Sequence, residues 1–250
     1  MVEIAISLAV IGIALVAIIG VLPIGMNTQR DNREETIINQ DATVLLEAIR
    51  GGARGLDDLT NYVYAITNFQ VVYPAGTPKT YGYTYVNSTL NGSPITPLLT
   101  NGFLIIGLLS TPEYLDVNGF PTNNLFLGGY SNHVVAYVHS ISGPAVEKPP
   151  QPNDSIIRED SFGYRVLCVN APVAVDTNIF NLPPPQQLYT KQLAANLHEL
   201  RLTFLWPQLP NGKVGPGRQT FRTMVAGQLA RDPIYNNLYF YASQSFVNTP

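Results

Sequence analysis

The sequence is poor in charge. Charged residues make up 12% of the 250 positions, about half the usual share, and the formal net charge is −3. No basic excess is present to neutralise phosphates or anionic headgroups, which excludes nucleic acid as a partner. Hydrophobic residues reach 46%, enough for a packed core. The exposed surface must therefore consist largely of neutral amide and hydroxyl groups, which suits a component of a solid exterior.

Cysteine and histidine are also scarce. The single cysteine, Cys168, excludes an internal disulfide, and its apolar neighbours predict a buried thiol. The three histidines, His133, His139 and His198, have no cysteine or carboxylate at metal-ligand spacing. A Gly-rich phosphate loop and a nucleophile elbow are absent as well. We therefore expect no cofactor, no metal site and no enzymatic activity.

The first charged residue after Glu3 is Arg30, and most of the positions between them are Ile, Val, Leu or Ala. The run from Ile4 to Gln29 is long enough to cross a bilayer as a helix. It is apolar on every side, so it must lie in lipid or among other chains. A cleaved secretory signal would have a basic leader, and no Lys or Arg precedes Arg30.

A carboxylate stands at the edge of this run. An ionisable group near or within lipid costs several kcal/mol unless it is paired, so Glu3 is a candidate functional residue that needs a partner. An ordinary single-pass anchor gives no reason for such a group. Glu3 therefore favours a segment that assembles with other chains.

The stretch Met1-Val2-Glu3-Ile4-Ala5-Ile6-Ser7-Leu8 resembles the conserved start of type IV pilins and type II secretion pseudopilins. In that family an aromatic residue and a Thr precede an apolar pair and a glutamate, and Met1, Val2 and Glu3 match the pair and the glutamate. The resemblance implies that a prepilin peptidase cuts a basic leader and methylates the new amine. The glutamate then meets that amine on a neighbouring subunit. We expect one or two further residues before Met1 in the native chain. The resemblance is specific over roughly residues 1–30 and supplies no motif beyond about residue 60.

Two further features of the segment fit a filament core. The family helix carries a proline and loosens in assembled filaments at the place where this chain has Gly20, Pro23 and Gly25. Proline removes a helical hydrogen bond and each glycine lowers helix propensity by roughly 1 kcal/mol, so we expect a helix break there within a filament. Small residues allow close approach of neighbouring helices. The alanines in question are Ala5, Ala9, Ala14 and Ala17.

The pattern becomes amphipathic after Arg30. Apolar residues fall on one stripe and charged residues on the opposite face, which predicts a helix with one face against a domain. The stripe consists of Ile38, Leu45, Ile49, Leu56 and Leu59, and the charged face of Arg33, Glu34, Glu47 and Arg50. Unbroken, the helix reaches about Leu59, although Gly51, Gly52 and Gly55 are placed to end it earlier.

After Asn61 the pattern is typical of strands. It is clearest from Glu199 to Trp206, where apolar and polar residues alternate. No helical pattern is found between the strands, so we expect antiparallel pairing. The predicted strands are 69–73, 80–86, 103–109, 134–141, 162–169, 197–206, 219–225 and 238–246. The predicted loops are 87–102, 142–154 and 181–187.

These patterns predict an α+β protein in which a long N-terminal hydrophobic helix packs on a large, antiparallel, β-rich globular head, a pilin-like lollipop. Its parts are a transmembrane or filament-core helix over 1–28, an amphipathic helix over 29–60 and the head over 61–250. The expected function is that of a structural subunit of an extracellular pilus-like or pseudopilus filament. The expected partners are other copies of the chain, the inner-membrane assembly machinery and prepilin peptidase. The subunit would wait in the bacterial inner membrane and then join an extracellular or periplasmic filament.

Two alternatives remain open. A minor pseudopilin of a type II secretion system would cap or prime such a filament, but such a subunit can lack the glutamate, so Glu3 argues mildly against it. A single-pass, membrane-anchored exported binding protein or enzyme would carry clustered pocket chemistry, for which the sequence offers no motif.

Overall fold

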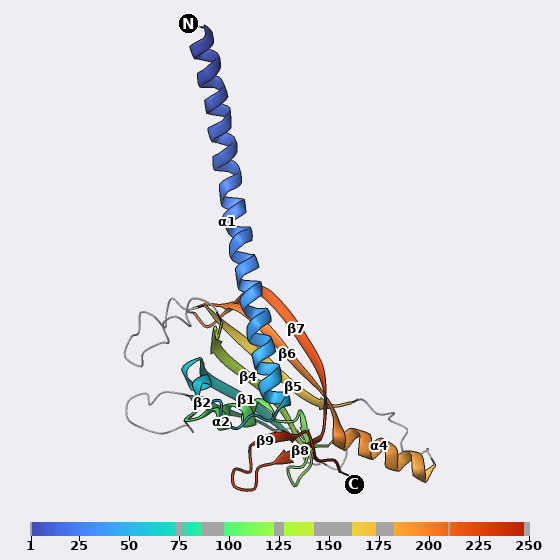
Figure 1. Cartoon of the computed structure of the whole chain (residues 1–250). Coiled ribbons are helices and arrows are strands. Elements are labelled where there is room, and N and C mark those ends of the chain that lie inside the picture. Colours follow the sequence, from blue (N-terminus) through green and yellow to red (C-terminus); the bar gives the residue numbers. More distant parts are fainter. Residues whose placement is uncertain are drawn as a thin grey trace. The chain divides into compact units, whose positions relative to one another are not determined.

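The computed structural model describes residues 2–73, 77, 79–86, 98–122, 128–142, 162–173, 183–209 and 211–247. The chain forms two compact units, one of residues 1–40 and one of residues 41–250. The protein combines a long apolar N-terminal helix with an antiparallel β-sheet domain and belongs to the α+β class (Figure 1).

The N-terminal helix, α1, runs from Val2 to Arg50. It ends where the glycines predicted a stop. The amide of Gly51 bonds the Glu47 carbonyl at 2.8 Å, and the amide of Ala53 bonds the Ala48 carbonyl at 3.0 Å. Gly52 has a φ of +59°, and a Cβ there would lie 2.3 Å from the Tyr241 carbonyl oxygen, so only glycine fits. The helix therefore stops short of Leu59, and a 3₁₀ turn, Asp57–Asn61, follows it.

The main sheet has seven antiparallel strands in the order β2-β1-β4-β5-β6-β7 (Figure 1). The short β3 pairs with β4 beside this row. A second sheet pairs β8 with β9. The strand bounds are β1 Val63–Tyr73, β2 Lys79–Val86, β3 Tyr114–Leu115, β4 Gly129–His139, β5 Gly163–Pro172, β6 Leu197–Gln208, β7 Val214–Ala226, β8 Gln228–Arg231 and β9 Tyr239–Ala242.

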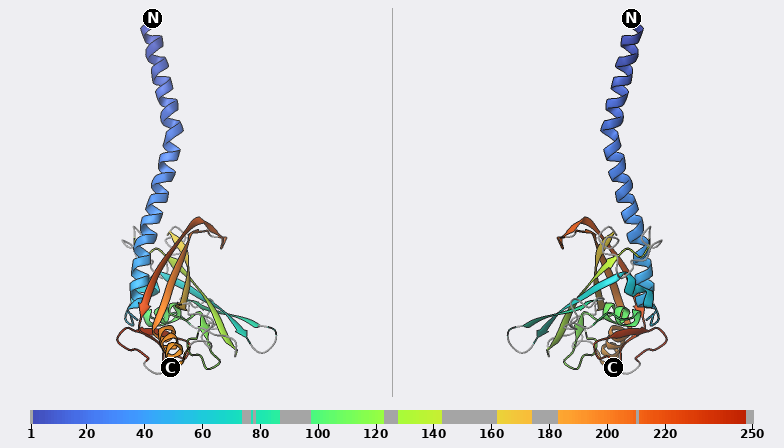
Figure 2. Two further views of the ribbon diagram at one scale, coloured as in Figure 1. Left: turned by 90° about the vertical axis from the view of Figure 1, so that its right-hand side faces the viewer. Right: turned by 90° about the vertical axis from the view of Figure 1, so that its left-hand side faces the viewer.

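One face of the main sheet forms the core of the head. Along β6 the side chains of Leu200, Leu202 and Phe204 are fully buried, which confirms the predicted alternation. The C-terminal turns of α1 lie against this face (Figure 2), and they contribute Leu45 and Ile49, both buried. A short helix, α2 (Gly102–Leu109), lies next to β1, β4 and β9 and adds four more buried apolar side chains.

Two predictions about the head are wrong. The run 103–109 is the helix α2 and not a strand. Asn101 caps it by accepting from the Leu104 amide at 2.9 Å, and the run is so uniformly apolar that its period is not visible. A second helix, α4 (Pro184–Asn196), begins inside the predicted loop 181–187. Proline fits the first helical turn because no hydrogen-bonding amide is required there, so the prolines mark a helix start.

The other predicted strands are confirmed, though with different ends. β1 begins at Val63, six residues before the predicted start, and β7 begins at Val214. Only Tyr239–Ala242 of the predicted strand 238–246 is a strand. The predicted loops 87–102 and 142–154 lie largely outside the described residues.

A buried carboxylate joins α1 to the sheet domain. Asp41, fully buried, accepts hydrogen bonds from the amides of Ile141 at 2.9 Å and Ser142 at 2.8 Å, and from the hydroxyl of Tyr164 at 2.7 Å. The Ser142 hydroxyl donates to it as well. Burial raises the pKa of the Asp41 carboxyl above its ordinary 3.8, while these four hydrogen bonds act to lower it. Asp41 thus links the helix to the chain after β4 and to β5.

Candidate functional site: the apolar segment of α1

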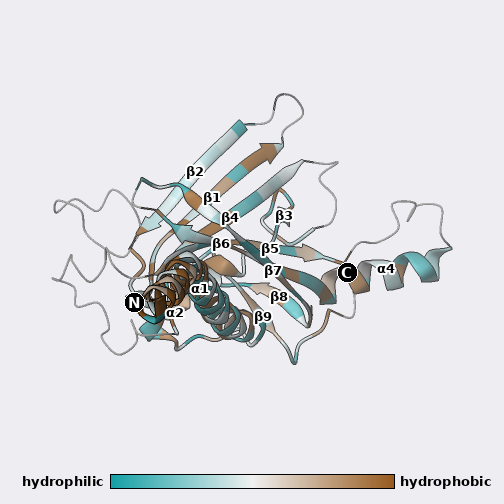
Figure 3. Cartoon of the chain, turned by 90° about the horizontal axis from the view of Figure 1, so that it is seen from above, coloured by the Kyte–Doolittle hydropathy of each residue, from teal (hydrophilic) through white to brown (hydrophobic). Residues whose placement is uncertain are grey.

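The surface of α1 from Val2 to Met26 consists mainly of exposed apolar side chains. Each of its large aliphatic residues has between 53% and 73% of its surface exposed. Seen along its axis in Figure 3, the start of the helix is hydrophobic on all sides. Soluble monomers rarely expose an apolar surface of this extent, so the segment requires a non-aqueous neighbour.

Within the described part of the chain, α1 is the one helix long and apolar enough to cross a membrane. About 20 apolar residues at 1.5 Å per residue span the hydrocarbon core of a bilayer. The helix is therefore compatible with membrane anchoring.

Glu3 lies in the first turn of α1 and is exposed. A carboxylate there interacts favourably with the positive end of the helix dipole, and the Ser7 hydroxyl donates to the Glu3 backbone carbonyl at 2.9 Å. The next charged residue along the helix is Arg30, about 40 Å away at 1.5 Å per residue. Residues 2–29 therefore offer Glu3 no cation with which it can pair.

The helix is continuous through Gly20, Pro23 and Gly25 in the single chain. Pro23 lacks an amide hydrogen, so one helical hydrogen bond is missing at this point. A Cβ added at Gly20 or Gly25 would meet no atom within 4 Å. Nothing in the single chain requires glycine there. The predicted break concerns the assembled filament and stays a prediction.

The small residues predicted to allow close helix packing are all exposed. Ala17 and Gly25 line a shallow apolar groove along α1 together with Val21 and Leu22. Small side chains beside larger ones form such a groove, into which a side chain of a neighbouring helix can fit. The other three alanines predicted for close packing, Ala5, Ala9 and Ala14, are also exposed.

The cysteine and two of the histidines of the head have ordinary structural surroundings. Cys168 is buried, and burial raises the pKa of its thiol to about 12. His198 is buried near Tyr241, and burial lowers its pKa. His139 stacks on Tyr64 at 4.7 Å between ring centres. No group of three or more His, Cys, Asp or Glu side chains that would hold a metal ion occurs among the residues with described positions.

Comparison of the chain with models of protein families, with curated proteins and with solved structures found no match. The case for a function therefore depends on the sequence and the geometry above.

Proposed function

We propose that the chain is a structural subunit of an extracellular type IV pilus-like or pseudopilus filament and that it polymerises through α1. The observation that carries the proposal is the apolar segment of α1, which is exposed on all sides and holds one carboxylate, Glu3, with no cationic side chain among residues 2–29. Membrane insertion alone would bury the apolar side chains. It would leave Glu3 without a partner.

Packing of α1 against copies of itself accounts for both features. Neighbouring apolar helices would cover the exposed aliphatic side chains, and the small residues would let the backbones approach closely. A positive group of the neighbouring subunit would pair with Glu3. In the family that the first residues resemble, this group is the amine at the N-terminus. The proposed subunit is thus held in the bacterial inner membrane, processed by a prepilin peptidase and delivered by assembly machinery to a homopolymeric filament.

A membrane-anchored exported protein that acts as a monomer is the other candidate. The apolar helix supports it equally, because a single span needs the same length. Glu3 favours the filament subunit over the monomeric anchor, because a single membrane span does not require a carboxylate at the edge of its apolar run. The small residues of α1 also favour assembly, because close packing between helices requires small side chains and contact with lipid does not.

The experiment enlarges a small residue on the exposed face of the helix. Ala17→Leu adds three carbons where the single chain has open surface, so membrane insertion and the head should be unaffected. In a tightly packed core the same carbons force neighbouring helices apart, which costs about 1–3 kcal/mol per subunit. We expect the yield of sheared, sedimentable polymer to fall by about tenfold or more.

Val16→Leu is the matched control, because Val16 is already large and 72% exposed. It should polymerise nearly as well as the unmodified chain. Absence of sedimentable polymer from the unmodified chain would overturn the proposed function. Equal yields from Ala17→Leu and the unmodified chain would show that no helix packs closely at this position.

A further inference from the structure

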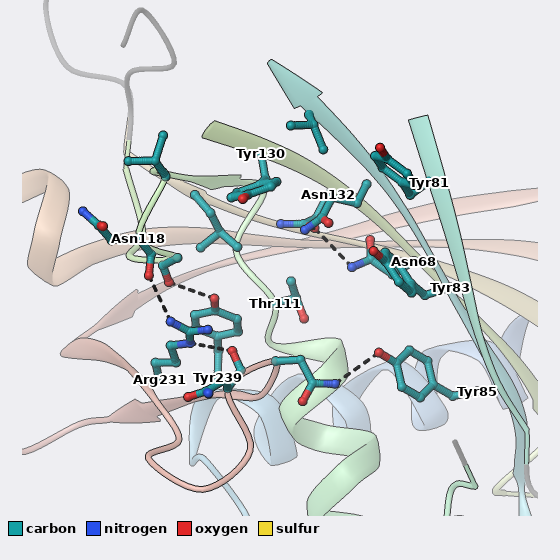
Figure 4. A pocket seen from close by; sticks show the side chains of 17 residues that line it. Asn68, Tyr81, Tyr83, Tyr85, Thr111, Asn118, Tyr130, Asn132, Arg231 and Tyr239 are labelled. Carbon is teal, nitrogen blue, oxygen red and sulfur yellow. Dashed lines mark hydrogen bonds between the residues drawn. The ribbon is translucent and has the colours of Figure 1, made fainter. Parts of the chain in front are cut away.

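The head contains a polar pocket of about 670 Å³ that no part of the filament proposal uses (Figure 4). It lies over the β2 end of the main sheet, and residues of β1, β2, β4, β8 and β9 line it. Its volume falls within the range of about 300–1,000 Å³ that is typical of small-molecule sites. All of its lining residues belong to the unit 41–250.

Tyrosine rings form one wall. Tyr81, Tyr83 and Tyr85 alternate along β2 and therefore point to the same face of the sheet. Tyr81 and Tyr83 are 46% and 47% exposed, so large parts of their surfaces are free for a ligand. The Tyr85 hydroxyl accepts from the Asn237 side chain at 3.1 Å, which fixes that ring at the end of the row.

Side-chain amides form the floor. Asn68 pairs across the ladder with Tyr83, and Gln70 with Tyr81, so each amide lies beside a ring. Oδ1 of Asn132 accepts from the amide nitrogens of Asn68 at 3.1 Å and Gln70 at 3.3 Å, and its Nδ2 donates to the Pro112 carbonyl at 3.0 Å. Asn132 therefore holds both amides in fixed orientations, and its contact with Asn68 is drawn in Figure 4.

One acceptor on this floor is left over. Oδ1 of Asn68 is buried and has no hydrogen-bond partner among the described residues. A buried carbonyl oxygen without a partner costs about 1–3 kcal/mol, and because this oxygen is closed to solvent, a ligand hydroxyl reaches it only when the Asn68 side chain turns toward the pocket.

The pocket is close to neutral. Of its seventeen described lining residues, Arg231 alone is charged. Its guanidinium already donates to two backbone carbonyls, from Nε to Asn236 at 2.5 Å and from Nη1 to Asn118 at 3.0 Å. These bonds direct the cation into the protein, which disfavours a phosphate or carboxylate as the main recognised group.

We propose that this pocket binds a neutral saccharide unit of a glycan. The C–H face of a sugar ring is apolar and fits against an aromatic face, while its hydroxyls both donate and accept hydrogen bonds. Tyr81 and Tyr83 supply the rings, and Asn68 and Gln70 supply amides that match hydroxyls. The proposal is independent of the filament, because it requires only the folded head.

A peptide strand added along β2, the edge strand of the main sheet among the described residues, is the competing use of this region. Such a strand would bind through the backbone of β2. Its affinity would not depend on Asn68, whose side chain lies on the face of the sheet. Substitution at Asn68 therefore separates a saccharide from a peptide.

The test measures ligand binding to the full-length chain in detergent micelles by saturation-transfer NMR. The neutral probes are four trisaccharides: one of β1,4-linked glucose, one of α1,4-linked glucose, one of mannose and one of N-acetylglucosamine. Sialyllactose serves as the anionic probe. We expect at least one neutral probe to bind. Tyr83→Ala and Asn68→Ala should each weaken its binding by about tenfold, since the first removes a ring and the second an amide of the pocket lining.

Tyr189→Ala is the matched control, because Tyr189 is an exposed tyrosine on α4 outside the pocket, and it should leave binding unchanged. Thermal unfolding of each variant shows whether the head is intact, and Tyr83→Phe retains the ring if the alanine variant is destabilised. Tyr83→Phe should keep most of the affinity. Lack of binding by every neutral trisaccharide, binding of sialyllactose alone, or binding unchanged in both Tyr83→Ala and Asn68→Ala would overturn the proposal.

Discussion

Replacement of Glu3 with alanine is expected to abolish polymer formation while the subunit stays in the membrane with a folded head. Glu3 and the whole of residues 1–40 lie outside the compact unit of the head, so the head's stability should not depend on this carboxylate. Removal of one partner of a buried ion pair costs about 3–5 kcal/mol, because the other charge is left buried and unpaired. Each subunit addition would then weaken by about 100-fold or more.

The measurement compares sheared polymer with the total membrane-bound subunit and with the protease resistance of the head. Glu3→Gln keeps the size and polarity of the side chain but removes its charge. Its yield of sheared polymer should be nearly as low as that of Glu3→Ala. Glu35→Ala is the matched control, because it removes an exposed carboxylate of the same helix beyond the apolar segment. Normal polymer yield from Glu3→Ala would defeat the proposed role, and loss of protease resistance would show that Glu3 acts on folding.

Asp41→Ala is expected to destabilise the head strongly. The substitution leaves the amides of Ile141 and Ser142 and the hydroxyl of Tyr164 without their acceptor. A buried donor without a partner costs about 1–3 kcal/mol. Because part of this cost is relieved when water enters, we expect a loss of about 3 kcal/mol in the free energy of unfolding. Chemical denaturation followed by the fluorescence of the single tryptophan, Trp206, which is largely buried in β6, gives this value.

Two further variants grade the effect of Asp41. Tyr164→Phe removes only the ring hydroxyl that donates to Asp41, and it should lower the free energy of unfolding by about 1 kcal/mol. Asp31→Ala removes an exposed aspartate of α1 and should leave the midpoint unchanged. If Asp41→Ala unfolds at the same denaturant concentration as the unmodified chain, the hydrogen bonds to Asp41 contribute nothing net to stability.

The elements that were predicted correctly depend on short-range patterns. An uncharged apolar run of the length of residues 4–29 is too long for a strand and predicts a helix, and Gly52 marks the end of α1 because its backbone has a positive φ. Along β6, the alternation of Leu200, Leu202 and Phe204 with polar residues is visible without knowledge of any partner strand.

The errors arise where a local pattern is ambiguous. The apolar run of α2 has no visible period, and its helical state is fixed by surroundings that lie far away in the sequence. A Cβ at Gly107 would lie 2.8 Å from the Phe240 ring and 2.9 Å from Leu238, which shows how closely β9 and the preceding turn pack on this helix. The prolines before α4 occur equally in loops and at helix starts.

The candidate sites differ in the same way. Glu3 stands out in the sequence because it is the one charge at the edge of a long apolar run. Asp41 does not, because its partners Ile141 and Tyr164 are about 100 residues away and only the fold brings them to it. The alternation of Tyr81, Tyr83 and Tyr85 indicates a shared face, but the amides opposite them depend on strand register, which no local pattern gives.

A density map of the particle sheared from cells is the most direct test of polymerisation through α1. We expect a filament whose centre is a bundle of α1 helices, with Glu3 beside a positive group of the neighbouring subunit and with regular helical hydrogen bonding lost between Gly20 and Gly25. Monodisperse particles in which α1 contacts only detergent or lipid would contradict polymerisation through this helix.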